Sequence, residues 1–527
     1  MSRAGAARRR PNGTALRAGT WCALVASASP IGAYAQTANP GLGLVGLDYA
    51  NDVERAAAQA NQNVFDALDA SCNPGGVLDT VPEPDAPPVG ASCNDDRFFV
   101  YLNTRELVHT ANEIRGSGSV VASLGQDLEG LGLALRWTAA EEFAVQSSMS
   151  TEFANSQLAN LAARMSALRF GAGGFATTNL FLLRPERSGL LAQNGAGATA
   201  DADATGETYS RWGGFLNGAF GYGTKEPTPL EDAFDFDGSE LTLGVDYRFA
   251  SNLVVGGILG LTEQTVDFDE AASRISVVDG NVDAEGASLI LFAFLQGERL
   301  SLSGSIGAQS LDYDVVRNIK YPSFNPDIES ANSIANSHPD SSVSMATFGV
   351  GYAFGRQKLT VEPFFNLELV DVTVRAFSEE RSINRLSNAA ESKRFDLAVS
   401  RQKIESLDAA IGVRLQYVFT PGFGVIVPYL SLDAHRELED DSRIITAGYS
   451  AIQDILGSQS FLVPTDVPDD AFTSASIGFS VVLRGGRQRE LDGPIAGGLS
   501  AFAQIRTVRG LLYYEDSVVT GGFRYEF

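Results

Sequence analysis

Residues that build many enzyme sites are scarce in this chain of 527 residues. It contains three histidines and three cysteines, and it lacks the H-E-x-x-H, C-x-x-C, G-x-S-x-G and Walker-loop patterns of zinc, redox, hydrolase and nucleotide sites. We assign His109 to a helix, His338 to an outer loop and His435 to a strand. The sequence therefore predicts no catalytic residue, no cofactor and no metal ligand. Acidic clusters near residues 267–270 and 437–441 are interpreted as solvated loop charge.

Positive charge and long apolar runs are also in short supply. Lys and Arg number 39 against 64 Asp and Glu, which gives a net charge of −25. Such an acidic chain is repelled by the phosphate backbone, so nucleic acid is not expected as a partner. No run of about 20 apolar residues follows the first 40, which excludes helical membrane spans. Membrane-spanning strands are not excluded, because their apolar and polar residues alternate.

The N-terminus has the layout of a secretory signal peptide. Arg8 to Arg10 precede a mostly apolar stretch of small residues, and Ala33-Tyr34-Ala35 offers a small-x-small cleavage site. We predict that residues 1–35 direct export through the Sec machinery and are then removed. Removal takes five arginines and no acidic residue, so the mature net charge is −30.

Export leaves two cysteines, Cys72 and Cys93, because Cys22 belongs to the predicted signal. An even pair in an exported chain predicts a disulfide, which would close a loop of about 20 residues and contribute roughly 3 kcal/mol. The loop carries five prolines, at positions 74, 82, 84, 87 and 88, which oppose regular structure there. A metal pair is the alternative, but no histidine lies beside either cysteine.

Residues 36–191 are predicted to form a small, mostly helical region. Asn51 and Glu54 open one helix, and residues 105–115 form a second. The clearest helix begins at Thr138, because Thr138 and Glu141 match a capping box, in which a hydroxyl and a carboxylate each accept a backbone N–H. One apolar stripe continues this helix through Leu158, Leu161, Met165 and Leu168. Residues 192–208, rich in Ala, Gly, Asp and Thr, are interpreted as a flexible linker.

From residue 209 to 527 the hydrophobic period changes to two, as residues 240–249 and 406–419 illustrate. The pattern predicts twelve antiparallel strands, near 209–223, 234–249, 253–267, 280–296, 299–313, 342–355, 358–374, 404–419, 423–437, 471–485, 497–508 and 515–527. Short turns such as 251–252 alternate with longer polar segments, including 314–341, 375–403 and 438–470. A soluble sandwich also alternates, but this alternation of connections is typical of a transmembrane β-barrel.

The polar face of these strands carries charge. Five charged residues lie opposite the apolar face: Asp246, Arg248, Glu368, Asp408 and Arg414. A water-filled lumen tolerates such side chains, and we expect them to pair across the barrel. At the end of the chain Phe523, Tyr525 and Phe527 alternate with charged residues, which is typical of an aromatic girdle at the lipid–water boundary.

Several segments, in this order and at this spacing, resemble the autotransporter β-domain family. They are WGGFLNG at 212–218, FDFD at 234–237 leading into LTLGVDYRF at 241–249, HREL at 435–438 followed by DSR at 441–443, and the ending FRYEF. The resemblance covers about residues 209–527. It implies a twelve-stranded barrel in outer-membrane lipid, inserted by the barrel assembly machinery, which reads the terminal Phe523, Tyr525 and Phe527. It also implies that the barrel carries or anchors an N-terminal passenger at the cell surface.

Residues 160–169 further resemble the helix that precedes the barrel in self-cleaving autotransporters. Those proteins cut between paired asparagines, whereas this chain has Ala159-Asn160. Because this chain departs from the paired asparagines, we expect an uncleaved helical segment.

We predict a type V secretion barrel of the bacterial outer membrane that displays or anchors a short helical segment and is not an enzyme. Two alternatives stay open, a passive porin-like channel and a surface hydrolase whose N-terminal catalytic site follows no recognised motif. No β-helical repeats precede the barrel, so no surface ligand is predicted.

Overall fold

The structure is a computed structural model. It describes residues 43–82, 93–139, 141–146, 149–151, 154–155, 157–158, 161–162, 165 and 212–526, with gaps at 251, 269–278, 357, 385–392, 422–424, 440–441, 457–460, 468, 485–486, 489–494, 497–498 and 512–513. The predicted signal peptide, the linker 192–208, Asn160 and Phe527 lie outside the described residues.

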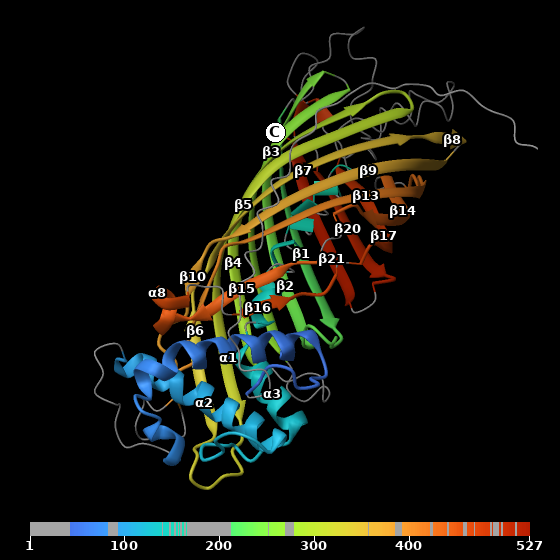
Figure 1. Ribbon diagram of the computed structural model, residues 1–527. Helices are drawn as coiled ribbons and strands as arrows, with labels where there is room; N and C mark the ends of the chain where they lie inside the picture. The colour runs from blue at the N-terminus through green and yellow to red at the C-terminus, as the bar shows by residue number, and fades with distance from the viewer. Residues whose placement is uncertain are drawn as a thin grey trace, which may run out of the picture. The chain divides into compact units, whose positions relative to one another are not determined.

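Twelve antiparallel strands close into a barrel (Figure 1). They are β1 (Trp212–Lys225), β2 (Phe234–Ala250), β3 (Leu253–Phe268), β4 (Gly280–Gln296), β5 (Leu300–Tyr321), β7 (Asp340–Tyr352), β9 (Leu359–Val374), β13 (Gln402–Tyr417), β14 (Val425–Glu437), β17 (Ala471–Arg484), β20 (Leu499–Arg509) and β21 (Tyr514–Glu526). Each strand pairs with its neighbours in the ring, and β21 pairs with β1 to close it. The predicted barrel and its twelve strands are confirmed.

Side chains alternate between the two faces of the wall, as β2 shows. Leu241, Leu243 and Val245 are 44%, 51% and 51% exposed on the outer face, whereas Thr242 and Asp246 are each 1% exposed on the inner face. A soluble protein would bury the leucines and expose the aspartate. The inverted arrangement is the one that lipid outside and polar groups inside require.

One end of the barrel carries far more structure than predicted. The strand β5 runs on to Tyr321 and forms a hairpin with β6 (Ala331–Ser337), which in turn pairs with β11 (Ile383–Asn384). Val315, Arg317 and Ile319 are fully or almost fully buried in this extension. The period of two therefore continues past residue 313, but an arginine on the buried face conceals it in the sequence.

The segments 375–403 and 438–470, predicted as polar outer loops, also contain strands. A four-stranded sheet runs in the order β10 (Phe377–Ser378), β12 (Leu397–Val399), β15 (Ile444–Tyr449) and β16 (Phe461–Pro464). A short 3-10 turn, η3 (Ser450–Ile452), and the helix α8 (Gln453–Leu456) follow β15. We call the four strands, together with η3 and α8, the loop sheet. At the other end of the barrel, β8 (Phe354–Arg356) pairs with β9, and β18 (Arg487–Gln488) pairs with β19 (Ile495–Ala496).

Three helices precede the barrel and pack against one another. They are α1 (Asp52–Cys72), α2 (Asp95–Arg115) and α3 (Leu128–Thr138), with the 3-10 turns η1 (Val77–Thr80) and η2 (Glu141–Ala144). We call residues 43–139 the helical module. The predicted start of α1 is confirmed, because the Asn51 side chain accepts a hydrogen bond from the Glu54 backbone N–H. The helix α2 begins ten residues before the predicted Arg105, at Asp95, where Asn94 provides the cap.

The predicted capping box at Thr138 is wrong. Thr138 is the last residue of α3, and its hydroxyl donates to the Leu135 carbonyl. The Glu141 carboxylate contacts Arg136 instead of a backbone N–H. A charged side chain five residues earlier thus binds Glu141 in place of the capping contact, and the cap of α3 is Asp127, eleven residues before Thr138.

Cys72 at the end of α1 and Cys93 before α2 form a disulfide. Phe65 stacks on Tyr101 with ring centroids 5.5 Å apart, which adds an apolar contact between the same two helices. Among the described residues, no helix is both long and apolar enough to cross a membrane.

The disulfide predicts a measurable loss when it is removed. The double variant Cys72→Ser with Cys93→Ser should lower the free energy of unfolding of the helical module by about 3 kcal/mol, because the closed loop spans 21 residues. Pulse proteolysis of the membrane-embedded protein measures this, with Ser71→Ala as the control. Equal stability of the double variant and the wild type would contradict the assignment.

Candidate functional site: the mouth and the lumen of the barrel

The barrel has one end with short connections and one with long ones. Residues 297–299 and the start of β1 lie at the short end. The β5–β6 hairpin, the loop sheet and the helical module lie at the other end (Figure 1). We call this second end the mouth. It is where sequence-distant segments converge.

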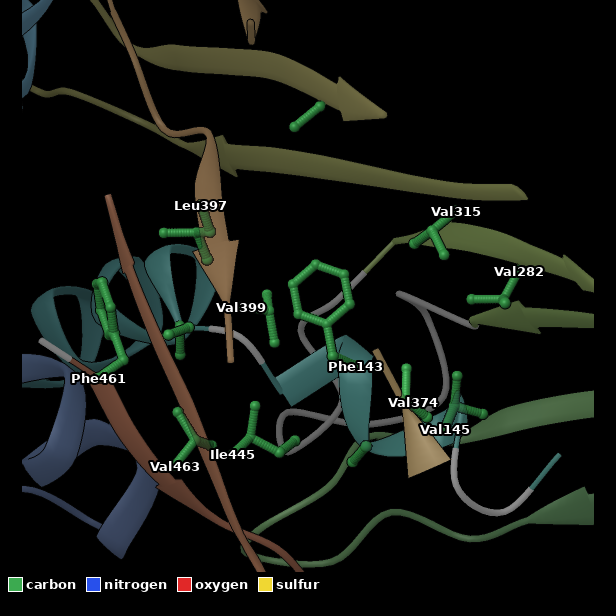
Figure 2. Close-up of a cluster of buried hydrophobic side chains, with 14 of the residues drawn as sticks. Phe143, Val145, Val282, Val315, Val374, Leu397, Val399, Ile445, Phe461 and Val463 are labelled. Atoms are coloured by element: carbon green, nitrogen blue, oxygen red, sulfur yellow. The ribbon is translucent and has the colours of Figure 1, made fainter. Parts of the chain in front are cut away.

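A continuous apolar core fills the mouth (Figure 2). Phe143 and Val145 enter it from the segment that follows α3. The remaining labelled side chains come from the barrel rim (Val282, Val315 and Val374) and from the loop sheet (Leu397, Val399, Ile445, Phe461 and Val463). Phe143 meets Phe377 of β10 edge-on at 5.1 Å between ring centroids. The barrel, its loops and the N-terminal region therefore share one core.

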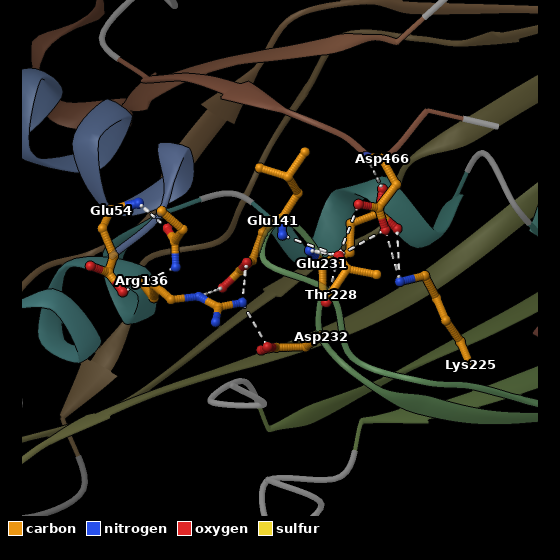
Figure 3. A network of polar contacts seen from close by, with 10 residues as sticks. Glu54, Arg136, Glu141, Lys225, Thr228, Glu231, Asp232 and Asp466 are labelled. Atoms are coloured by element: carbon orange, nitrogen blue, oxygen red, sulfur yellow. Dashed lines mark hydrogen bonds and ion pairs between the residues drawn. The ribbon is translucent and has the colours of Figure 1, made fainter. Parts of the chain in front are cut away.

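Buried ion pairs connect the same parts (Figure 3). The Arg136 guanidinium donates to both oxygens of Glu141, at 3.1 and 2.8 Å, and to Asp232 at 2.7 Å. All three side chains are 1% exposed. Because Asp232 lies between β1 and β2, this triad joins the helical module to a barrel connection. Beside it, Lys225 lies 3.1 Å from Asp466.

A second buried pair joins the β5 extension to the outer loop after β9. Arg317 binds Glu379 in bidentate fashion, at 2.8 and 2.6 Å, and both side chains are fully buried. Lys393 of the same loop lies 2.6 Å from Glu106 of α2, again almost fully buried. Removing one partner of such a pair typically costs 3–5 kcal/mol, because the other charge is left buried and alone.

One buried amide links three elements. The Tyr449 hydroxyl of β15 donates to Asn61 Oδ1 of α1 at 2.8 Å, and Asn61 Nδ2 donates to the Thr138 hydroxyl of α3 at 3.0 Å. Each side chain is at most 1% exposed. Loop sheet and helical module thus satisfy each other's buried polar groups.

From the mouth the chain enters the lumen. The described residues between 145 and 165 are helical, and most of them are buried. Near the rim, the Tyr313 hydroxyl donates to the Gln146 carbonyl at 3.4 Å and also hydrogen-bonds to Ser150. Deeper, Gln157 lies against Gly260, in the middle of β3, so close that a methyl group there would clash with the amide. The described part of this segment therefore lies in the lumen between the mouth and the middle of β3.

Each sequence-predicted lumenal charge lies on the inner face, with partners near most of them. Asp246 accepts two hydrogen bonds from Arg524 of β21, at 2.7 and 3.2 Å. Arg414 lies 3.7 Å from Glu362 and over the Phe364 ring. Glu368 is cross-strand to Asp408 and Arg248 to Val254. Phe523 and Tyr525, of the predicted terminal aromatics, are 54% and 45% exposed on the outer face.

The three histidines occupy unrelated places. Asp408 and Asp433 contact the two ring nitrogens of His435 at 2.6 and 2.7 Å. His338 is 63% exposed and His109 is buried in α2, where its Nδ1 accepts the Ala122 N–H at 3.1 Å. No group of three His, Cys, Asp or Glu side chains suited to a metal occurs in the part of the chain that the structure describes.

The autotransporter β-domain family matches residues 214–486, just over half of the chain. The chain belongs to this family. Solved structures similar to this autotransporter include the translocator domain of NalP from Neisseria meningitidis, at 14% identity and TM-score 0.39, which covers 62% of this chain and 92% of that one. The β domain of the Bordetella autotransporter BrkA matches at 16% identity and TM-score 0.38, covering 60% and 99%. The transport unit of AIDA-I from Escherichia coli matches at 11% and 0.37, covering 70% and 98%. Comparison with curated protein sequences finds no match.

The autotransporter barrel is therefore a translocator of the bacterial outer membrane, with lipid around its apolar outer face. Short turns face the periplasm in such barrels, so the mouth opens on the cell surface. The sequence reasoning missed the groups that close it, namely Arg136, Arg317 and Glu379. Their partners lie far along the chain, and no local pattern marks them.

A further buried carboxylate of the mouth, that of Glu142, leads to a stability prediction. Both of its carboxylate oxygens are buried with no hydrogen-bond partner among the described residues, and burial raises its pKa well above the usual range. Glu142→Leu should raise the free energy of unfolding of the autotransporter's mouth by about 1–2 kcal/mol. The neighbouring Glu141→Leu should lower it by about 3 kcal/mol, because Arg136 loses one of its two carboxylate partners and keeps only Asp232. Pulse proteolysis checks both, and a destabilised Glu142→Leu protein would refute the prediction.

His109 predicts how the helical module responds to acid. Burial, helped by nearby Arg105, lowers its pKa from 6.5 to about 4, so the folded module keeps it neutral. Protons therefore bind the unfolded form first, and stability falls as the pH drops from 6.5 to 4. The loss should reach roughly 2–3 kcal/mol. His109→Asn retains an acceptor for Ala122 and should flatten this part of the profile in proteolysis measurements. An unchanged profile would contradict the role of His109.

Proposed function

We propose that this autotransporter carries its own helical module to the cell surface and keeps it there as a permanent, non-catalytic cap on the barrel. The module would be the passenger, and the barrel its translocator and anchor. The observation that carries the proposal is the shared core of the mouth, to which the segment after α3, the barrel rim and the loop sheet all contribute. A passenger destined for release needs no such common core.

The segment around Asn160 supports retention of the passenger on the barrel. The family members that release their passengers cut at paired asparagines, and this chain has alanine before Asn160. Gln146, Ser150 and Gln157 also contact the barrel wall directly. A covalently continuous segment of this kind would tether the cap and obstruct the pore, which argues against a passive porin.

The family and the two ends of the chain indicate how the protein would be exported and inserted into the outer membrane. Residues 1–35 would direct Sec export, residues 36–191 would form the passenger region and residues 192–208 a linker before the barrel at 209–527. The barrel assembly machinery would recognise the terminal strand with Phe523, Tyr525 and Phe527. No catalytic role is assigned to the passenger, because its one histidine, His109, is buried and bound to the Ala122 N–H, and its sequence follows no recognised catalytic motif.

Surface display can be tested in intact cells. We would insert an epitope tag between Gly116 and Ser117, in the turn where α2 ends, and express the full chain with its signal. Antibody should bind intact cells, because the mouth opens outward. The same antibody should detect one full-length mature band, which begins at Gln36, in the outer-membrane fraction and none in the medium.

Two controls and two outcomes make the test decisive. A tag placed at Gly297, in a periplasmic turn, should be reached only after the cells are permeabilised. Labelling of the module only after permeabilisation would contradict surface display. A shorter tagged fragment in the medium would contradict permanent anchoring.

A further inference from the structure

A groove of about 480 Å³ lies on the outer face of the barrel, across β13, β14, β17 and the end of β20. Two rows of cross-strand neighbours build it. Ile411, Ala434, Thr473 and Arg509 form the row nearer the mouth, and Val413, Leu432 and Ala475 form the next. Ala434, Thr473 and Ala475 are small, so the wall is hollowed between larger neighbours.

The large side chains beside this floor project outward. Ile411 is 67% exposed and Leu432 is 48% exposed, in keeping with the rest of the apolar outer face. Since this face lies in lipid, the occupant that the groove meets is an acyl chain rather than a protein. An acyl chain that lies in the groove gains van der Waals contacts with its walls and fills a hollow that would otherwise be poorly packed.

A single cationic group stands at the mouth end of the groove. Arg509 is the last residue of β20, and Gly510 begins the outer turn with a φ of 93°. The Arg509 Nη1 donates to the Val508 carbonyl at 3.1 Å, and Thr473 donates its hydroxyl to the Arg509 carbonyl at 3.1 Å. A guanidinium has five N–H donors, so most remain for a ligand.

Arg509 differs from the other exposed arginines of this rim. Arg436 lies 3.5 Å from Asp470, and Arg375 lies 2.6 Å from Asp340. Within the described ranges, no carboxylate lies at ion-pair distance from Arg509. An uncompensated arginine at headgroup depth, beside an apolar groove, is complementary to a lipid with an anionic headgroup.

We propose that this groove binds a phosphate-bearing lipid of the outer leaflet, with the phosphate on Arg509 and an acyl chain against Ala434, Thr473 and Ala475. The site is separate from the mouth, and it would hold the barrel wall below the outer loop 438–470.

Native mass spectrometry of the full-length protein in detergent, titrated with diphosphorylated lipid A, tests this site. Arg509→Gln should weaken lipid A binding about tenfold, and Ala434→Phe, which fills the groove, should weaken it similarly. The matched control Arg375→Gln removes the same charge from the same rim and should bind within about twofold of the wild type. Heat-dependent gel migration checks that each barrel is folded.

Three results would overturn the proposal. Equal binding by wild type, Arg509→Gln and Ala434→Phe would show that the face is covered by lipid without a site. If dephosphorylated lipid A bound as tightly as diphosphorylated lipid A, Arg509 would not bind a phosphate. A loss confined to Arg509→Gln, with Ala434→Phe unaffected, would show that no acyl chain occupies the groove.

Discussion

The pairing of β1 with β21 is the contact on which the rest of the structure depends. It joins the two ends of the barrel sequence through a register that runs from Gly213 with Glu526 to Lys225 with Tyr514. In lipid an unpaired backbone N–H or C=O costs several kcal/mol, so an open sheet of this length would not persist in a membrane. Once the barrel is closed, successive residues of each strand face the lumen and the lipid in turn. The polar lumen must then be occupied by protein or by water.

The chain fills that lumen from the cell-surface side. The segment after α3 runs from the mouth, where Gln146 and Ser150 hydrogen-bond to Tyr313, to Gln157, which lies against Gly260 of the wall. Above it, the mouth is closed by an apolar core and by buried charges that are compensated almost entirely within it. Arg136 and Arg317 are each satisfied by carboxylates from other elements. Glu142 is the exception, because its buried carboxylate has no hydrogen-bond partner among the described residues, and burial raises its pKa well above the usual range.

Different parts of this architecture were accessible to sequence reasoning for physical reasons. The strands could be predicted, because a barrel wall between lipid and a polar lumen imposes strict alternation on every strand. The cap of α1 could be predicted from Asn51, a local interaction. The helix α3 could not, because Gly130 and Gly132 lower its helix propensity and only packing stabilises it. The ion pairs of the mouth could not either, since Arg136 and Asp232 lie 96 residues apart and meet only once the barrel is closed.

The central claim is that the helical module and the loop sheet form one cooperative unit on the barrel, and hydrogen exchange tests it most directly. The amides of α1 and of β15 should open with the same free energy in the full-length protein. Tyr449→Ala, which removes the hydroxyl that binds Asn61, should accelerate exchange in both elements by the same factor. Faster exchange in β15 with α1 still protected would mean that the module folds independently of the loops, and the account of a shared, sealed mouth would be wrong.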